Sequence, residues 1–241
     1  PPHIFGFVKL LDSSDGAEIA RYELDNHPAS AVLFTPGGKD LLLASWGEIL
    51  YSLNPESGKT NWTYDLSDPT GYNAFHSADL HPGGSQFVAG STDHRVYLLN
   101  VKDGKVLHVI EPWEGHTKTV KAVSFSPNGR LLATAGEDQS IKIWDTAGYR
   151  LVHFLKGHTG TVTGIAWDPS GNMLYSSSND GTLRLWNLEA PFERTYEICD
   201  FGPWQTPFAQ GNRVFAAPCS DSRLAVYEAA TGAMTANLGP E

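Results

Sequence analysis

Three side chains that could form a hydrolytic site lie close together in the sequence: His116, Thr134 and Asp138. A histidine beside a carboxylate and a hydroxyl is the set with which many hydrolases activate a nucleophile. The same set returns 42 residues further on. Its second copy consists of His158, Ser176 and Asp180. A catalyst needs one copy, so the recurrence favours a structural role for both sets.

These residues belong to a longer repeat. The stretch from Gly115-His116 to Trp144-Asp145 is followed by a similar one, from Gly157-His158 to Trp186-Asn187. A large apolar residue ends a short β-rich run every 41 to 46 residues, and a Pro-x-Gly turn recurs in the same phase. Proline presets one turn dihedral and glycine accepts a positive φ, so such turns separate strands. The apolar markers are Leu11, Leu53, Leu99, Trp144, Trp186 and Tyr227.

Each unit contains four expected strands. In the fourth unit they cover residues 120–126, 131–135, 140–144 and 151–155, with apolar residues on alternate positions of the third. A terminal tryptophan adds apolar surface to its other face, as in a sheet packed between two sheets. The later units cover about 26–66, 67–110, 111–155, 156–198 and 199–238, while residues 1–25 supply only two strands. We expect an all-β chain of five complete four-stranded antiparallel sheets and half of another.

A repeat of this length that ends in Trp-Asp resembles the WD-repeat family of β-propellers. The resemblance implies that the sheets are blades around an axis, six or seven in the complete ring. It also implies a buried hydrogen-bond chain in each typical blade. The matching positions are His116, Thr134, Asp138 and Trp144, and then His158, Ser176, Asp180 and Trp186. Other units lack this set: Gly71 and Cys199 replace the histidine, Leu99 and Tyr227 the tryptophan. We expect those units to rely on apolar packing.

The second unit also resembles the repeat of quinoprotein dehydrogenase propellers. The resemblance covers residues 47–62, with the run Leu50-Tyr51-Ser52-Leu53-Asn54, then Gly58-Lys59 and Trp62. In that family the tryptophan docks one blade onto the next. The resemblance therefore implies blade packing and does not by itself imply the cofactor.

Composition narrows the classes of partner. The formal net charge is −10, and the 17 basic residues are not clustered, so we expect neither nucleic acid nor an anionic membrane as partner. No apolar run approaches the ~18 residues of a membrane-spanning helix. Cys199 and Cys219 lack the spacing of metal ligands, and phosphate-binding loops are absent. We predict no catalytic residue, no metal and no cofactor. The compartment stays open, with the cytoplasm favoured.

The remaining role is a binding platform. By the resemblance, partner contacts come from the third and fifth residues after the repeat histidine and from the residue before the turn aspartate. Trp46 precedes Gly47 in a turn, so we expect it to be exposed, and an exposed tryptophan is a common interface anchor. Trp46 and Trp204 are equally compatible with covering the hub or packing on a neighbouring loop, and Thr and Ser at these positions are more often residues of solvated loops. The predicted positions are Ser30, Trp46, Ala74, His76, Thr92, Thr119, Lys121, Glu137, Thr161, Thr163, Asn179, Trp204 and Ser220.

We therefore predict a non-catalytic scaffold that binds a peptide or partner domain on its blade-loop face. The acidic charge favours a basic partner, and other domains of the same parent chain are further candidates. Residues 1–241 would form one propeller domain of a longer, seven-bladed parent. Two alternatives remain: a quinoprotein-like propeller enzyme or cofactor-bearing subunit, and a purely architectural subunit of a complex.

Overall fold

The computed structural model describes residues 6–24, 27–66, 73–189, 192–197, 208–210, 214–218, 224–228 and 234–238. Within these ranges the chain is β-structure joined by turns, with one single-turn 3-10 helix at Pro36–Gly38. No helix in the described ranges has the length and apolar character needed to cross a membrane.

In the part of the chain that the structure describes, twenty-two strands follow one another. They are β1 (Gly6–Leu11), β2 (Glu18–Leu24), β3 (Ala29–Phe34), β4 (Leu41–Ser45), β5 (Ile49–Leu53), β6 (Thr60–Asp65), β7 (Phe75–Leu80), β8 (Gln86–Ser91), β9 (Val96–Asn100), β10 (Val106–Ile110), β11 (Val120–Phe125), β12 (Leu131–Gly136), β13 (Ile141–Asp145), β14 (Leu151–Leu155), β15 (Val162–Trp167), β16 (Met173–Ser178), β17 (Thr182–Asn187), β18 (Phe192–Glu197), β19 (Phe208–Gln210), β20 (Val214–Pro218), β21 (Leu224–Glu228) and β22 (Met234–Leu238). In the fourth unit the predicted strands agree with β11–β14 to within one residue at each end.

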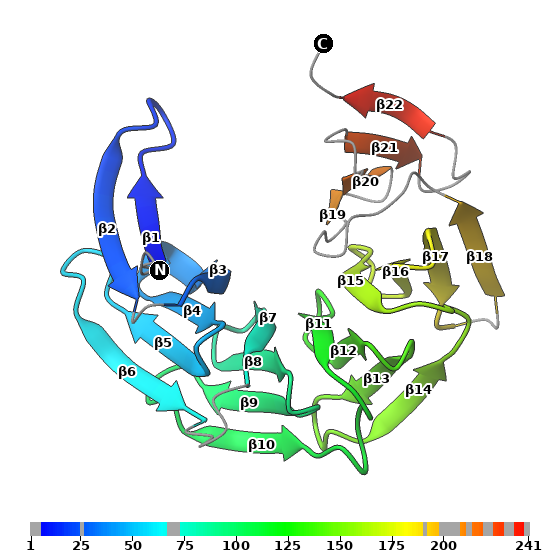
Figure 1. The fold of residues 1–241 in the computed structure, drawn as a ribbon, viewed down its shortest axis with the longest axis horizontal. Coiled ribbons are helices and arrows are strands. Elements are labelled where there is room, and N and C mark those ends of the chain that lie inside the picture. The colour runs from blue at the N-terminus through cyan, green and yellow to red at the C-terminus, as the bar shows by residue number, and fades with distance from the viewer. Residues whose placement is uncertain are drawn as a thin grey trace, which may run out of the picture.

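These strands form six antiparallel sheets in chain order. The first sheet has two strands, β1 and β2, and the second to sixth sheets each have four. Figure 1 shows the sheets following one another along an arc, with β3, β7, β11 and β15 on its inner side and β6, β10, β14 and β18 on its outer side. The inner strands of neighbouring sheets contact each other: β3 with β7, β7 with β11, and β11 with β15. The prediction of five complete sheets and a half is confirmed.

The core lies between the sheets, because both faces of the middle strands are covered in the second, third and fourth sheets. Leu42 and Leu43 are neighbours on β4, their side chains point to opposite faces, and both are fully buried. Leu42 packs in a cluster with Phe75 of the third sheet, whereas Leu43 packs with Tyr22 of the first. An apolar run without alternation is therefore what a strand between two neighbours requires.

Trp62 of β6 joins the second sheet to the third. Its indole Nε1 donates a hydrogen bond to the backbone oxygen of Val101 at 2.7 Å. Gly104 lies under the ring with a φ of +67°, and a Cβ atom there would stand 2.7 Å from Trp62. The tryptophan singled out by the quinoprotein-like repeat thus docks its sheet against the next one.

Buried polar groups join the third sheet to the fourth. The carboxylate of Asp79 accepts the N–H of Phe125 at 2.7 Å, and burial raises the pKa of that carboxyl group. The His81 ring packs edge-on against Phe125, and its Nε2 lies 3.1 Å from the oxygen of Gly129. Adjacent sheets are therefore fixed in register by directional bonds as well as by apolar contact.

The turn after the third strand of the fourth sheet has no glycine at its positive-φ position, unlike the equivalent turns at Gly16, Gly58 and Gly104. The residue with a positive φ is Tyr149, at 53°, one position after Gly148. The Tyr149 ring stacks on His108 of the third sheet with a centroid distance of 4.7 Å, and its hydroxyl donates to Gln86 Oε1 at 3.0 Å. These contacts offset the strain of a left-handed tyrosine.

Candidate functional site

The fourth sheet holds a continuous buried chain of hydrogen bonds. Trp144 Nε1 donates to Thr134 Oγ1 at 2.9 Å, and Thr134 Oγ1 lies 2.8 Å from His116 Nε2. The other ring nitrogen, Nδ1, lies 3.0 Å from both carboxylate oxygens of Asp138. A neutral imidazole with its proton on Nδ1 satisfies all these partners. The chain ties the loop before β11 to β12, to β13 and to the turn between them.

Asp138 is held as a carboxylate within this chain. Burial acts to raise its pKa, but His116, Ser140 and the N–H of Thr117 all donate to it and hold its pKa far below the usual range. The His116 side chain is fully buried. An imidazole so enclosed is suited to holding loops together and is not accessible to a substrate.

The fifth sheet repeats the arrangement almost atom for atom. His158 Nδ1 lies 2.8 Å from Asp180 Oδ2, and His158 Nε2 lies 2.8 Å from Ser176 Oγ. Trp186 Nε1 donates to the same Ser176 oxygen at 2.8 Å. Burial again acts to raise the carboxyl pKa, but the hydrogen bonds from Thr182, Thr159 and His158 outweigh it and lower the pKa of Asp180 to about 2.

The third sheet replaces this chain with another polar set, which corrects our expectation that it relies on apolar packing. Its turn carboxylate, Asp93, accepts the hydroxyl of Tyr97 at 2.5 Å and Nη1 of Arg95 at 3.1 Å. Arg95 Nε donates in turn to Glu111 at 2.8 Å. Burial and the bond to Asp93 raise the pKa of Tyr97 far above its usual value. In this sheet a tyrosine and an arginine bind the turn carboxylate, in place of the chain that contains the histidine and tryptophan. The repeat pattern does not indicate this replacement.

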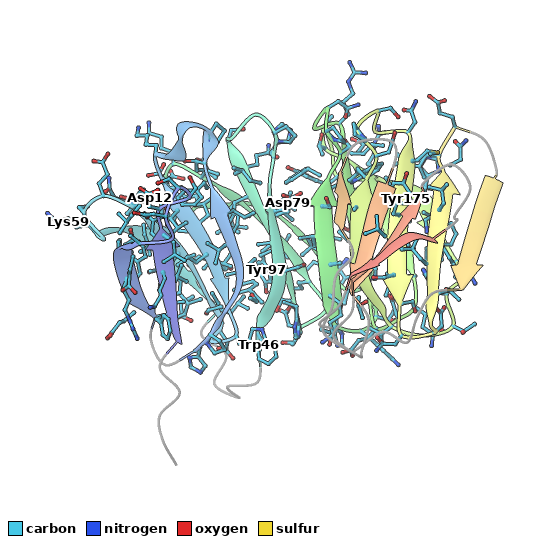
Figure 2. All side chains as sticks on the ribbon, turned by 90° about the horizontal axis from the view of Figure 1, so that it is seen from above. Asp12, Trp46, Lys59, Asp79, Tyr97 and Tyr175 are labelled. Carbon is cyan, nitrogen blue, oxygen red and sulfur yellow. The ribbon has the colours of Figure 1, made fainter. Side chains whose placement is uncertain are left out.

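Four predicted positions from three consecutive sheets meet on one surface. Trp46 of the second sheet packs edge-on against His76 of the third, with a centroid distance of 5.6 Å. His76 Nε2 lies 3.2 Å from Lys121 Nζ of the fourth sheet, and Lys121 Nζ lies 3.1 Å from Glu137 Oε1. We call these four residues the Trp46 surface. Figure 2 places Trp46 at the end of the molecule opposite Asp12 and Lys59.

The charges of the Trp46 surface are set by its own contacts. Burial and the ammonium of Lys121 lower the pKa of His76 to about 4. His76 is therefore neutral near pH 7, and its Nε2 accepts a hydrogen bond from Lys121 Nζ. Trp46 is 42% exposed, and the Glu137 side chain is 38% exposed. The surface thus presents an indole and a carboxylate edge, with the lysine beneath them.

The remaining predicted positions do not all reach solvent. Thr119 and Thr163 are buried, and Thr163 Oγ1 lies 3.2 Å from Ser177 Oγ. Thr92 is half-buried, and its Oγ1 accepts the N–H of Ala74 at 2.8 Å. Ser30 and Thr161 are half-buried and Asn179 is exposed. Trp204 and Ser220 lie outside the described residues, as do Cys199 and Cys219.

Sequence reasoning overlooked one conspicuous side chain. Trp113 is 77% exposed, the largest exposure among the described large apolar residues. It lies in the loop between β10 and β11. Arg95 and Glu111 lie at the end of the third sheet where this loop begins. The run Pro112-Trp113-Glu114, between a strand and Gly115-His116, was the available signal. A tryptophan flanked by proline and glutamate outside any strand has no core to enter.

A family model described as "WD domain, G-beta repeat" matches residues 104–145 and 149–187. These matched segments contain most of both hydrogen-bond chains. His116 and Trp144 lie in the first segment, and His158 and Trp186 lie in the second.

Curated relatives match over a larger part of the chain. The WD repeat-containing protein SL1-17 of Schistosoma mansoni is 28% identical over 145 residues, 60% of this chain and 46% of that protein. The serine-threonine kinase receptor-associated protein of Rattus norvegicus is 37% identical over 139 residues, 58% of this chain and 37% of that protein. Minichromosome loss protein 1 of Schizosaccharomyces pombe is 29% identical over 150 residues, 60% of this chain and 18% of that protein. The match therefore spans less than half the length of each relative.

Repeat proteins of this kind generally serve as non-catalytic scaffolds for other proteins. In the described ranges, no three His, Cys, Asp or Glu side chains are grouped as they would be to hold a metal ion. The two matched repeats, the four-stranded sheets packed face to face, and the buried His–Asp chains agree with one another. Residues 104–145 and 149–187 are WD repeats, and the chain is similar over 60% of its length to a WD-repeat protein.

Proposed function

We propose that this chain is a non-catalytic scaffold and that the Trp46 surface is where its protein partner docks. One observation carries the proposal: side chains from three sheets, separated by 91 positions between Trp46 and Glu137, form one contiguous set of contacts. Hydrogen bonds and packing fix these side chains before a partner arrives. Preorganisation of this kind reduces the entropy lost on binding.

The chemistry of the Trp46 surface favours a partner with an apolar and a basic group. The indole of Trp46 supplies a rigid anchor, which is the kind of residue that dominates interface energies. Lys121 is already paired with Glu137, so a basic partner side chain meets a carboxylate edge and no isolated ammonium. The net charge of −10 adds a long-range attraction for basic segments.

A capture experiment tests this docking surface. Trp46→Ala removes the anchor, and Leu151→Ala removes a side chain of nearly equal exposure, 43%, from the outer strand β14. Purified wild-type and variant chains are used as baits, and captured proteins are measured by quantitative mass spectrometry. We expect Trp46→Ala to lose its specific partners, by about tenfold or more in bound amount, while Leu151→Ala retains them.

The same experiment separates the alternatives. If both variants capture the same proteins in the same amounts as wild type, the Trp46 surface is not the docking site. A purely architectural subunit would show this result, because its contacts lie at the sheet edges. A quinoprotein-like propeller would instead yield a coloured protein containing Ca²⁺ and a quinone, which absorption spectroscopy and metal analysis detect.

We propose further that residues 1–241 form a single propeller domain of a longer polypeptide, as a seven-bladed parent would require. The two strands of the first sheet, against four in each of the others, support this. Mass spectrometry of the protein isolated from its source gives the length of the parent chain. A mature chain of this length that closes its own ring would contradict the proposal.

A further inference from the structure

A pocket of about 380 Å³ opens beside the outer strands of the fourth sheet. It is bounded by β13 and β14, by the loop before β11 and by the turn between β12 and β13. None of its residues belongs to the Trp46 surface. It is lined by Thr117, Asp138, Gln139, Ser140, Lys142, Phe154, Lys156 and His158.

Two ammonium groups face one aromatic ring in this pocket. Lys142 of β13 and Phe154 of β14 are directly opposite each other across the two strands. Lys156 is two residues beyond Phe154, so its side chain leaves the same face of the chain. The Nζ atoms of Lys142 and Lys156 lie 5.3 Å and 4.7 Å from the centroid of the Phe154 ring. The ring is therefore in cation–π contact with two ammonium groups.

The positive charge of this pair is only partly compensated. Among the residues that the structure describes, neither lysine has a carboxylate within ion-pair distance, whereas five other basic side chains and both network histidines have one. Lys142 Nζ donates to the backbone oxygen of Gly115. Asp138 also lines the pocket and attracts Lys142, but its oxygens already accept bonds from His116, Ser140 and Thr117.

The positive charges of Lys142 and Lys156 also repel each other. Burial lowers the pKa of Lys142 despite the attraction of Asp138, and the charge of Lys156 lowers it further. An anion between the two ammonium groups would relieve this repulsion and form charge-assisted hydrogen bonds with both. The exposed side chains of Thr117 and Gln139 stand at the rim of the same pocket and supply neutral donors.

We propose that this pocket is an oxyanion site, in which Lys142 and Lys156 bind a phosphoryl or carboxylate group carried at the end of a partner's side chain. The site goes beyond the scaffold role, because it uses the outer strands β13 and β14 and none of the residues that form the Trp46 surface. In a chain with a net charge of −10, it is a local inversion of charge that would select an acidic group at a defined position.

Binding of inorganic phosphate to the 241-residue chain tests the site. Amide resonances of the chain are followed by NMR as sodium phosphate replaces sodium chloride at constant ionic strength. Lys156→Gln removes one charge from an exposed side chain, so the fold is kept. Lys102→Gln is the control, because it removes the same charge from the exposed turn between β9 and β10 of the third sheet. We expect saturable shifts at Thr117, Gln139 and Lys156. Affinity should fall about tenfold in Lys156→Gln and stay within about twofold in Lys102→Gln.

Peptide probes identify the group that the site prefers. Pentapeptides of glycine with a central phosphothreonine, glutamate or threonine are titrated in the same way. Tighter binding of the phosphothreonine peptide assigns a phosphoryl ligand, and tighter binding of the glutamate peptide assigns a carboxylate ligand. The proposal is overturned if phosphate shifts no resonance of the pocket beyond the chloride reference, or if Lys156→Gln binds it as wild type does. Partner capture through the Trp46 surface is independent of this result, so the two proposals fail separately.

Discussion

At the scale of single residues, histidine has two distinct uses in this protein. His116 and His158 are enclosed, and each spends one ring nitrogen on a carboxylate and the other on a hydroxyl. His76 lies at the surface between an indole and an ammonium group, and its pKa of about 4 keeps it neutral at physiological pH. The residue type is the same, and the neighbours supplied by other sheets decide which use it has.

The hydroxyl of Thr134 is the central link of the chain in the fourth sheet. Thr134→Val keeps the shape but leaves Trp144 Nε1 and His116 Nε2 without their shared partner in a buried place. We expect the free energy of unfolding to fall by roughly 1–3 kcal/mol. Urea denaturation followed by circular dichroism measures this. Thr159→Val is the matched control, because Thr159 is exposed and contributes its N–H to Asp180; an equal loss in both variants would contradict the assigned role.

The depressed pKa of Asp180 predicts how stability depends on acid. The pKa is lowered from 3.8 to about 2 in the folded state, so the unfolded chain binds a proton more readily than the folded chain does between these values. The stabilisation is complete above about pH 4 and is lost as pH falls towards about 2. Denaturation at a series of pH values should show a shallower fall for Asp180→Asn than for wild type. Glu189 is an exposed carboxylate just after β17. Glu189→Gln should therefore keep the pH dependence of the free energy of unfolding that wild type has.

At the scale of elements, the sheets are held together by tryptophans that bond across a boundary. Trp62 bonds to Val101 between the second and third sheets. Trp167 Nε1 donates to the oxygen of Ser124 at 3.0 Å between the fourth and fifth sheets. Each bond satisfies a buried indole N–H and fixes the distance between neighbours, which apolar contact alone leaves adjustable.

Two glycines in equivalent turns allow the cost of backbone strain to be compared with the cost of disturbing the contact between sheets. Gly16 and Gly104 both have a positive φ, at 74° and 67°, but a Cβ atom at Gly16 meets nothing within 4 Å whereas one at Gly104 meets the Trp62 ring. Gly16→Ala should cost about 1 kcal/mol for the left-handed conformation. Gly104→Ala should cost roughly 1–3 kcal/mol more, because the sheets must move apart. Urea denaturation of both variants measures the loss in the free energy of unfolding. Equal losses would show that the Trp62 ring moves aside without a free-energy cost.

At the scale of the whole molecule, the sheets form an open arc, and they differ in how far neighbouring sheets cover them (Figure 1). The third and fourth sheets have neighbours on both sides and contain fully buried middle strands. The first sheet has two strands and exposes Phe7, Leu11 and Ile19. A two-stranded sheet is marginal by itself, so its stability depends on what covers it.

Hydrogen exchange should report this difference directly. We expect amides of β1 and β2 to exchange through local opening well before those of β12 and β13, which should require global unfolding. Exchange followed by mass spectrometry on the 241-residue chain, with β6 and β14 as outer strands of complete sheets for reference, tests this. Protection of β1–β2 equal to that of β12–β13 would mean that the half sheet is completed in solution.

The number of strands in each unit, and their bounds in the fourth unit, followed from the sequence because both markers are local. A Pro-x-Gly turn and an alternating apolar run act within a few residues, and the sheets have only sequential, antiparallel neighbours. The two His–Asp chains could be named because they recur at one spacing. The Asp93–Tyr97–Arg95–Glu111 set could not, because it occurs once in the described chain and its parts have no repeat to identify them.

The sequence by itself determined the repeat, the strand pairs within each sheet and the polar residues that brace two of the sheets. Short-range forces act between residues less than about a repeat apart, so their outcome is written in one unit of sequence. Only the tertiary structure decided what lies between units: that Trp46 reaches His76 and Lys121, that Trp62 covers Gly104, and that Thr119 is buried. These contacts depend on how each sheet is rotated against the next, which is set by packing over the whole interface and by no single residue pair.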